Sequence, residues 1–140
     1  MCRAEPEPDT QAATRTVVLV VEDDPEMNEL ERQLLEARGL EAIGALTGAE
    51  AVRLAQQNGL DGVLLDLMLP EMDGFETCRR LRATSDAPIV ILTALDSDDC
   101  RQRGLDAGAS AYFTKPFDPD EVIETLRELI ADRRRASDVN

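Results

Sequence analysis

The chain has 140 residues, 43% of them hydrophobic, which is enough for one domain with a buried core and short for two domains of ordinary size. Its 15 Lys and Arg residues against 29 Asp and Glu residues give a net charge of −14, so the phosphate backbone of a nucleic acid would repel it. We therefore expect no direct nucleic-acid binding by this chain. The absence of histidine excludes histidine-based catalysis and imidazole ligation of a metal.

Cysteine usage and hydropathy predict a cytoplasmic protein. Cys2, Cys78 and Cys100 are odd in number and lack the spacing of a metal site, which favours reduced thiols in a reducing compartment. The apolar runs are only as long as strands, and the first ten residues are acidic and proline-rich without the apolar stretch of a signal peptide. We expect no contact with a membrane.

Short apolar runs alternate with helical patterns from Thr16 onward, which is typical of repeated βα units. Continuous apolar runs at residues 17–21, 63–65 and 89–92 indicate strands that helices cover on both faces. Residues 41–45 are more polar, which indicates an edge strand, and residues 111–114 are the fifth predicted strand. We expect an α/β fold, a doubly wound five-stranded parallel sheet in the flavodoxin-like order 2-1-3-4-5 with helices on both faces.

Capping residues mark the predicted helix starts. Asp24 and Asp118 each precede a proline, and Thr47 and Asp73 each precede a glutamate at the capping-box spacing. The last helix is predicted to end near Asp132. These boundaries divide the chain into a disordered arm at residues 1–14, a folded domain at residues 15–132 and a basic and polar tail at residues 133–140.

Polar residues stand at or just after the ends of four predicted strands. They are Glu22 and Asp23, Asp66, Thr93 and Lys115. Ligands of a parallel sheet bind beyond the carboxyl ends of its strands, so we expect these side chains to lie together. Converging carboxylates repel unless a cation lies between them, and Mg²⁺ accepts carboxylates, water and phosphate oxygens. The pattern predicts a magnesium site around a carboxylate that accepts a phosphoryl group, with a lysine to neutralise the phosphoryl oxygens.

In four places the sequence resembles the receiver domains of two-component response regulators. The matching segments are residues 20–24, which include the acidic pair, residues 65–74 around Asp66, residues 92–94 around Thr93, and residues 115–117, which begin with Lys115. The resemblance runs from about residue 16 to residue 132 and has the four segments in the family's order. Each segment alone is a weak signal, whereas four in register are highly specific.

The resemblance implies an acceptor and a metal site. Asp66 takes a phosphoryl group from a phosphohistidine on a histidine kinase or a histidine phosphotransfer protein. Asp23, Asp66 and the backbone carbonyl of Met68 coordinate Mg²⁺, and Glu22 acts through a metal-bound water. Lys115 contacts a phosphoryl oxygen.

The resemblance also implies a switch. Thr93 moves to hydrogen-bond the phosphoryl group, helped by the backbone amide of Ala94, and Tyr112 turns inward to fill the vacated space. The bond between Lys115 and Pro116 is cis. The surface that changes is formed by the fourth predicted helix, near residues 97–107, the fifth strand and the fifth helix. The protein is then a signalling switch that catalyses only its own phosphotransfer and autodephosphorylation.

Partners and oligomeric state stay open in the sequence. The family's large DNA-binding branch usually carries an acidic pair where this chain has Ser110 and Ala111, which weakens the expectation of that branch's dimer. A monomer and a phosphorylation-dependent dimer are both compatible with the chain. The domain either works through a downstream protein partner or belongs to a longer regulator with an output domain.

Two other classes of protein share part of this pattern. A phosphatase of the haloacid dehalogenase type needs a second acid two residues after the nucleophile, where this chain has Met68. A pseudo-receiver that binds partners without phosphorylation is disfavoured by the complete set of acids, Thr93 and Lys115.

The residues two positions after Asp66 and Thr93 are Met68 and Leu95. Their side chains offer no polar group to an attacking water, which predicts slow autodephosphorylation.

Overall fold

Ten helices and strands alternate in a computed structural model of the chain, which describes residues 16–139. The expected disordered arm at residues 1–14 lies outside the described residues. In chain order the elements are β1 (Val17–Val21), α2 (Pro25–Glu36), β2 (Glu41–Ala45), α3 (Gly48–Gln57), β3 (Gly62–Leu65), α4 (Gly74–Thr84), β4 (Ile89–Thr93), α5 (Asp98–Asp106), β5 (Ala111–Thr114) and α6 (Pro119–Val139).

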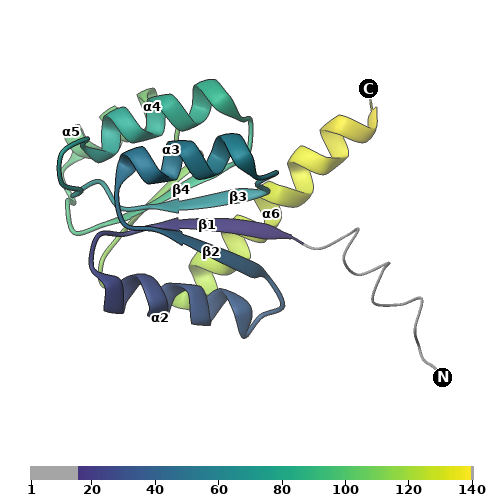
Figure 1. The fold of residues 1–140 in the computed structure, drawn as a ribbon. Helices are drawn as coiled ribbons and strands as arrows, with labels where there is room; N and C mark the ends of the chain where they lie inside the picture. Colours follow the sequence, from purple (N-terminus) through teal and green to yellow (C-terminus); the bar gives the residue numbers. More distant parts are fainter. Residues whose placement is uncertain (1–15, 140) are drawn as a thin grey trace.

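The strands form one parallel sheet in the order β2-β1-β3-β4-β5 (Figure 1). The predicted fold class is therefore confirmed, and so is the edge position of β2. Because β1 lies between β2 and β3, the strand order reverses next to it, and ligand sites of open parallel sheets form at such a point. The carboxyl ends of β1, β3, β4 and β5 consequently share one edge of the molecule.

Successive strand side chains point to opposite faces, and each face buries its own helices. On one face Leu19, Val63 and Ile89 pack with Ala51 of α3 and Leu81 of α4. On the other face Val18, Leu64 and Val90 pack with Leu35 of α2 and Leu126 of α6. Figure 1 shows α3 and α4 above the sheet and α2 below it. The all-apolar strands read from the sequence are thus explained by burial on both sides.

The predicted N-caps are confirmed. The side chains of Asp24, Thr47 and Asp73 accept hydrogen bonds from the backbone amides of Glu26, Glu50 and Glu76, respectively. Asp118 accepts from the amide of Asp120 in the same way at the start of α6. Each cap satisfies a first-turn amide that has no partner within its own helix.

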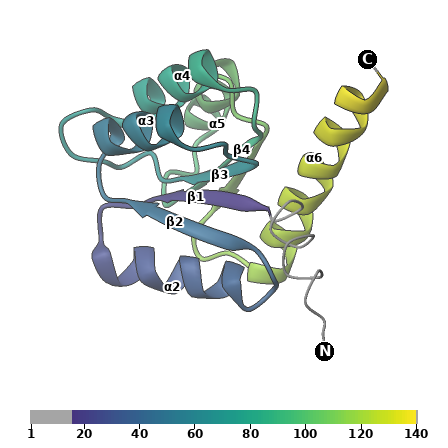
Figure 2. The same cartoon turned by 45° about the vertical axis from the view of Figure 1, so that its right-hand side comes forward.

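The last helix is longer than predicted. Because α6 continues to Val139, its predicted end near Asp132 is wrong, and the segment described above as a basic tail is helical from residue 133 to residue 139 (Figure 2). No glycine or proline follows Asp132, and arginine is a good helix former, so nothing in the sequence stops the helix there.

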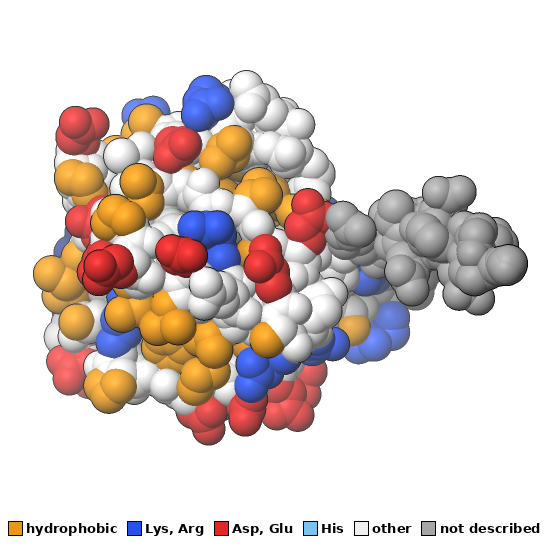
Figure 3. Space-filling model, turned by 60° about the horizontal axis from the view of Figure 1, so that its bottom comes forward, with side chains coloured by type: hydrophobic (Ala, Val, Ile, Leu, Met, Phe, Trp, Pro, Cys, Tyr) orange, Lys and Arg blue, Asp and Glu red, His pale blue; other side chains and the backbone are white. Residues whose placement is uncertain are grey.

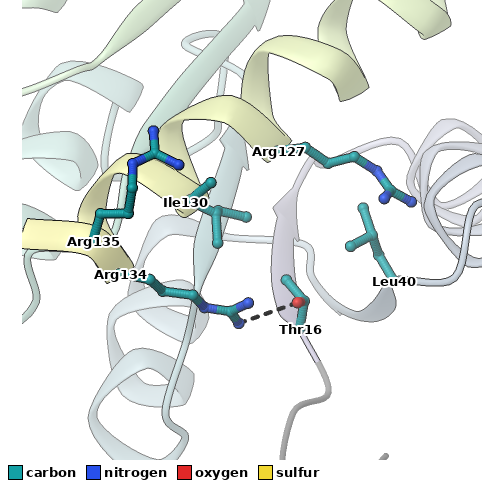
Figure 4. A pocket seen from close by; sticks show the side chains of 7 residues that line it. Thr16, Leu40, Arg127, Ile130, Arg134 and Arg135 are labelled. Carbon is teal, nitrogen blue, oxygen red and sulfur yellow. Dashed lines mark hydrogen bonds between the residues drawn. The ribbon is translucent and has the colours of Figure 1, made fainter. Parts of the chain in front are cut away.

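Ion pairs also fasten this part of α6 to the sheet. Arg133 pairs with Asp86, and Arg134 pairs with Asp61. Arg134 also donates to Thr16 Oγ1, directly before β1 (Figure 4). None of the described helices is both long and apolar enough to cross a membrane.

Candidate functional site

A half-buried lysine joins two buried carboxylates at the carboxyl edge of the sheet. Lys115 Nζ lies 2.7 Å from Glu22 Oε1 and 3.0 Å from Asp66 Oδ2. Glu22 follows β1, Asp66 follows β3 and Lys115 follows β5, so three strands bring these groups together. Glu22 and Asp66 are only 3% and 8% exposed. Buried carboxylates are tolerated when they are paired and hydrogen-bonded, as they are here.

Burial and hydrogen bonding together shift the pKa values of Lys115 and Glu22. Burial lowers the pKa of Lys115, but the hydrogen bonds to Glu22 and Asp66 outweigh burial and raise it above its ordinary value. Burial raises the pKa of Glu22, although the hydrogen bonds from Lys115 and from the amide of Asp24 oppose the shift. The lysine is therefore a permanent cation at neutral pH, placed within contact of the carboxylate that follows β3.

The loops after β1 and β3 complete the acidic edge. Asp66 Oδ1 accepts a hydrogen bond from the amide of Met68 at 2.9 Å, which folds the loop back over the carboxylate. Asp24 donates its amide to Glu22 Oε2 at 3.2 Å. Asp23 is exposed beside this group. Each acid that the sequence analysis singled out thus lies at the edge where the strands end.

Oxygen donors at this edge fit the small, hard Mg²⁺ ion. In the described part of the chain, no three acidic or cysteine side chains lie close enough together to hold a metal ion by themselves. Magnesium in proteins takes one or two carboxylates and fills its octahedron with water and phosphate oxygens. The oxygen donors at this edge therefore match the chemistry of Mg²⁺, and the magnesium site expected at Glu22, Asp23, Asp66 and the Met68 carbonyl stays a prediction.

Thr93, Leu95 and Tyr112 form a connected chain of contacts beside the lysine. Thr93 is fully buried at the end of β4, and its carbonyl accepts from the amide of Lys115 at 2.8 Å. Its hydroxyl accepts from the amide of Leu95 at 3.4 Å. The Tyr112 hydroxyl donates to the carbonyl of Leu95 at 2.6 Å. Residues 93–95 therefore link the acidic edge to β5.

Tyr112 lies inward in this structure. Its ring is buried, and Arg101 of α5 stacks on it with the guanidinium carbon 4.8 Å from the ring centre. Arg101 also donates to the carbonyl of Tyr112 at 3.1 Å. The movement of this ring on phosphorylation, expected from the resemblance, stays a prediction. The Lys115–Pro116 bond is cis, as expected.

Sequence reasoning missed a buried acid on α2. Glu31 is 4% exposed, and its Oε2 has no hydrogen-bond partner among the described residues. Burial raises its pKa to about 7, with Lys115 acting against the shift and the carboxylates of Glu22 and Asp66 acting with it. Its spacing from Asn28 and Leu35, three and four residues, was the signal that it lies on the buried stripe.

Glu31 should make the stability of the domain depend on pH. An acid whose pKa is higher in the folded than in the unfolded state destabilises the fold when it ionises, so the cost is absent below about pH 4.5 and complete above about pH 7. Glu31→Gln keeps a neutral side chain of the same shape. We expect it to raise the free energy of unfolding by up to about 3 kcal/mol at alkaline pH and by much less at mildly acidic pH.

Denaturant titrations at the two pH values measure this difference. Glu36→Gln, which alters an exposed carboxyl on the same helix, is the matched control and should give the same small change at both pH values. A gain for Glu31→Gln that does not grow with pH would show that Glu31 finds a partner when it ionises.

Gly104 of α5 should hold Tyr112 inward by leaving room for its ring. A Cβ at Gly104 would lie 2.8 Å from Ile91 Cδ1 and 3.2 Å from Tyr112 Cδ2. Burial raises the pKa of Tyr112, and the chain has one tyrosine and no tryptophan, so an absorbance titration reports on this ring alone. We expect Gly104→Ala to displace the ring and lower that pKa toward its ordinary value.

Gly59→Ala is the control for this titration, because a Cβ there meets nothing within 4 Å. An unchanged titration in Gly104→Ala would mean that Ile91 gives way and the ring stays in place.

Known proteins resemble this chain in sequence and in fold. The family model of the response regulator receiver domain matches residues 18–127. The response regulator MprA of Mycobacterium sp. (strain KMS) is 44% identical over 122 residues, which cover 86% of this chain and 52% of that protein. The DNA-binding dual master transcriptional regulator RpaA of Synechocystis is 40% identical over 116 residues, 81% of this chain and 48% of that protein. The chain thus spans about half the length of these relatives.

Solved structures agree in fold. The receiver domain of Francisella response regulator 1452 superposes with a TM-score of 0.80 at 33% identity, over 85% of this chain and 99% of that one. The receiver domain of the sensor histidine kinase PA1611 from Pseudomonas aeruginosa, solved with a magnesium ion in its active-site cleft, superposes with a TM-score of 0.77 at 32% identity, over 84% of this chain and 98% of that one. The family model alone covers well over half of the sequence, and the chain belongs to the response regulator receiver domain family.

Proposed function

We propose that this receiver domain accepts a phosphoryl group on Asp66 and transmits the change to the surface of α5, β5 and α6. The observation that carries the proposal is the Lys115 ammonium, held 3.0 Å from Asp66 Oδ2 and protonated at neutral pH. A carboxylate with a fixed cation at its side can attack phosphorus while the cation neutralises the phosphoryl oxygens. The complete set of acids, Thr93 and Lys115 disfavours a receiver that works without phosphorylation.

In the proposed transfer an Asp66 oxygen forms a bond to phosphorus as the bond from phosphorus to the donor's imidazole nitrogen breaks. The electron pair of the broken bond stays on the imidazole, and the phosphoryl charge is taken up next to Lys115. Asp23, Asp66 and the Met68 carbonyl would hold a magnesium ion, with Glu22 acting through water, and the ion would supply further neutralisation of the phosphoryl oxygens. The chain's own contribution is to keep the acceptor, the cation and the loop amides in place beforehand.

The response of the domain is proposed to start at Thr93. Its hydroxyl has only a long contact with the amide of Leu95, at 3.4 Å, so little holds it in its present position. A phosphoryl group on Asp66 offers charged acceptors to this hydroxyl and to the amide of Ala94, and charge-assisted hydrogen bonds are the stronger ones. Movement of Thr93 shifts residues 93–95 and with them the acceptor of the Tyr112 hydroxyl.

A groove beside Lys115 is proposed to receive the phosphodonor, a histidine kinase or a histidine phosphotransfer protein. It has a volume of about 480 Å³ and runs between α2 and the loop that leads to α6. Figure 3 shows hydrophobic side chains gathered on the side of the molecule where α2 lies. A protein bound there places its phosphohistidine next to Asp66. The groove is lined by Met27, Leu30, Glu31, Leu34, Lys115, Pro116, Phe117 and Pro119.

The charge of the chain and its relatives support a proposal about the partners, location and oligomeric state of the domain. With a net charge of −14 the chain itself is not expected to bind nucleic acid, so its output passes through a downstream protein partner or an output domain. We further propose a cytoplasmic location and either a monomer or a dimer that forms on phosphorylation.

Phosphorylation should depend on Asp66 and on magnesium. Incubation with Mg²⁺ and a small-molecule phosphodonor is expected to add the mass of one phosphoryl group, read by intact-mass spectrometry. Asp66→Ala removes the acceptor oxygen and should abolish the added mass, and Asp23→Ala should slow its appearance strongly. Asp106→Ala, an exposed acid of α5, is the control and should label like the wild type. Undiminished labelling of Asp66→Ala would refute the assignment of the acceptor.

The phosphorylated state should decay slowly. Hydrolysis needs a water aligned with the phosphorus, and the side chains of Met68, which is 54% exposed, and Leu95 crowd its approach without a polar group to orient it. Met68→Asn combined with Leu95→Glu introduces such groups and should speed the loss of the phosphoryl group roughly tenfold or more. Decay is followed by intact mass after the donor is removed.

Leu105→Glu is the control for this experiment, because it adds a carboxylate to an exposed position of α5 instead. Equal decay in the wild type and the polar double variant would rule out exclusion of water by Met68 and Leu95.

A further inference from the structure

Asn28 of α2 is a buried polar residue that the proposed chemistry does not use. It is 1% exposed. Its side-chain Nδ2 lies 3.3 Å from the carbonyl oxygen of Val20, 3.1 Å from that of Glu22 and 3.0 Å from that of Ala45. Val20 lies in β1, Glu22 directly follows it, and Ala45 is the last residue of β2. One amide group therefore ties the helix to the place where the two strands stop pairing.

Two neighbours fix the orientation of this amide. Arg32 Nε donates to Asn28 Oδ1 at 2.8 Å, so the oxygen faces the arginine and the NH₂ group faces the strands. Gly44 of β2 leaves the space that the amide fills, because a Cβ there would lie 2.4 Å from Asn28 Oδ1. We call Asn28, Arg32 and Gly44 the Asn28 network.

Hydrogen bonds hold both the amide and the carbonyl of Glu22 in place. The Glu22 amide donates to the Ala45 carbonyl at 3.1 Å, which continues the pairing with β2 by one residue. The Glu22 carbonyl has moved beyond the sheet, and Asn28 supplies its donor. With both groups held, the side chain of Glu22 leaves the backbone in one direction, toward Lys115 at 2.7 Å, and the next residue, Asp23, begins from a fixed peptide plane.

We propose that Asn28 is a positioning residue for the acidic edge: it holds the Glu22–Asp23 peptide so that these two acids meet Lys115 and a magnesium ion in the geometry that phosphoryl transfer needs. It touches neither the phosphoryl group nor the metal. The inference rests on the proposed function and adds to it a residue outside the four matching segments. Groups that orient metal ligands from behind typically change metal affinity by ten- to a hundredfold when they are lost.

The test measures Mg²⁺ affinity by titration calorimetry, well below the melting temperature, in the wild type, Asn28→Ala, Gly44→Ala and the double variant. Asn28→Ala should raise the Kd for Mg²⁺ about tenfold. Gly44→Ala should raise it too, because the new Cβ displaces the amide of Asn28. In the double variant that Cβ no longer meets the Asn28 amide, and the flexible Arg32 side chain, whose Nε would lie 2.8 Å from it, can move aside. The second change should therefore add little to the first.

A second readout needs no metal. Hydrogen exchange at the amides of Glu22 and Asp23 should accelerate several-fold in Asn28→Ala, because the peptide between them is released. Asn58→Ala, which removes an exposed amide at the end of α3, should leave both readouts unchanged. If Asn28→Ala does not fold, Arg32→Ala frees the same amide to rotate and should raise the Kd in the same direction.

The outcomes separate the inference from the proposed function. A wild type that takes up a phosphoryl group on Asp66, together with an Asn28→Ala variant of unchanged Kd and unchanged exchange at Glu22 and Asp23, overturns the positioning role alone. Lower melting temperatures with an unchanged Kd would give Asn28 a purely structural role and overturn the inference as well. A wild type that neither binds Mg²⁺ nor takes up a phosphoryl group overturns both proposals.

Discussion

The contact of one ammonium group with two buried carboxylates is the constraint on which the acidic edge depends. Lys115 follows the edge strand β5, whereas Glu22 and Asp66 follow the interior strands β1 and β3, so their meeting depends on the strand order. Removing the lysine would leave two carboxylates buried without a counter-charge, which is far more costly than removing an exposed pair. Lys115 neutralises the buried acids, and it is also the cation that the proposed phosphoryl group would contact. The stability of the fold and the proposed chemistry therefore depend on the same side chain.

Helix α2 shows what this arrangement demands of the layer behind it. An amphipathic helix normally buries an apolar stripe, yet two of the three buried positions of α2 are the polar residues Asn28 and Glu31. Asn28 compensates by satisfying carbonyls at the strand ends, while Glu31 keeps one oxygen without a partner among the described residues. Polar groups in such positions reduce stability, and they occur where a site requires them. Both residues lie near the acidic edge: Asn28 donates to the Glu22 carbonyl, and the charges of Lys115, Glu22 and Asp66 act on Glu31.

How far the sequence could predict this structure depends on the range of the interactions involved. The strands, the N-caps and the common edge of Glu22, Asp66 and Lys115 were predictable because they follow from local periodicity and from the rule that parallel strands end together. The predicted end of α6 near Asp132 was wrong because no glycine or proline follows that residue, and a long-range ion pair such as that of Arg133 with Asp86 cannot be found from the local sequence. Asn28 was missed because its acceptors lie at the ends of two strands and in the loop after β1. One of them, Ala45, is seventeen residues away, and no local pattern encodes that contact.

The contacts around Tyr112 suggest how a change at Asp66 could reach the surface without a large rearrangement. Thr93, Leu95 and Tyr112 are joined in sequence by two hydrogen bonds, and Arg101 then joins the ring to α5 through its stacking and its hydrogen bond. A ring packed against Gly104 and Ile91 has little room for intermediate positions, so it favours two discrete arrangements over a continuous range. Under the proposed function the phosphoryl group forms new hydrogen bonds with the Thr93 hydroxyl and the Ala94 amide. The free energy of these bonds, relative to the contacts that they replace, limits how far the equilibrium of the α5 surface can shift.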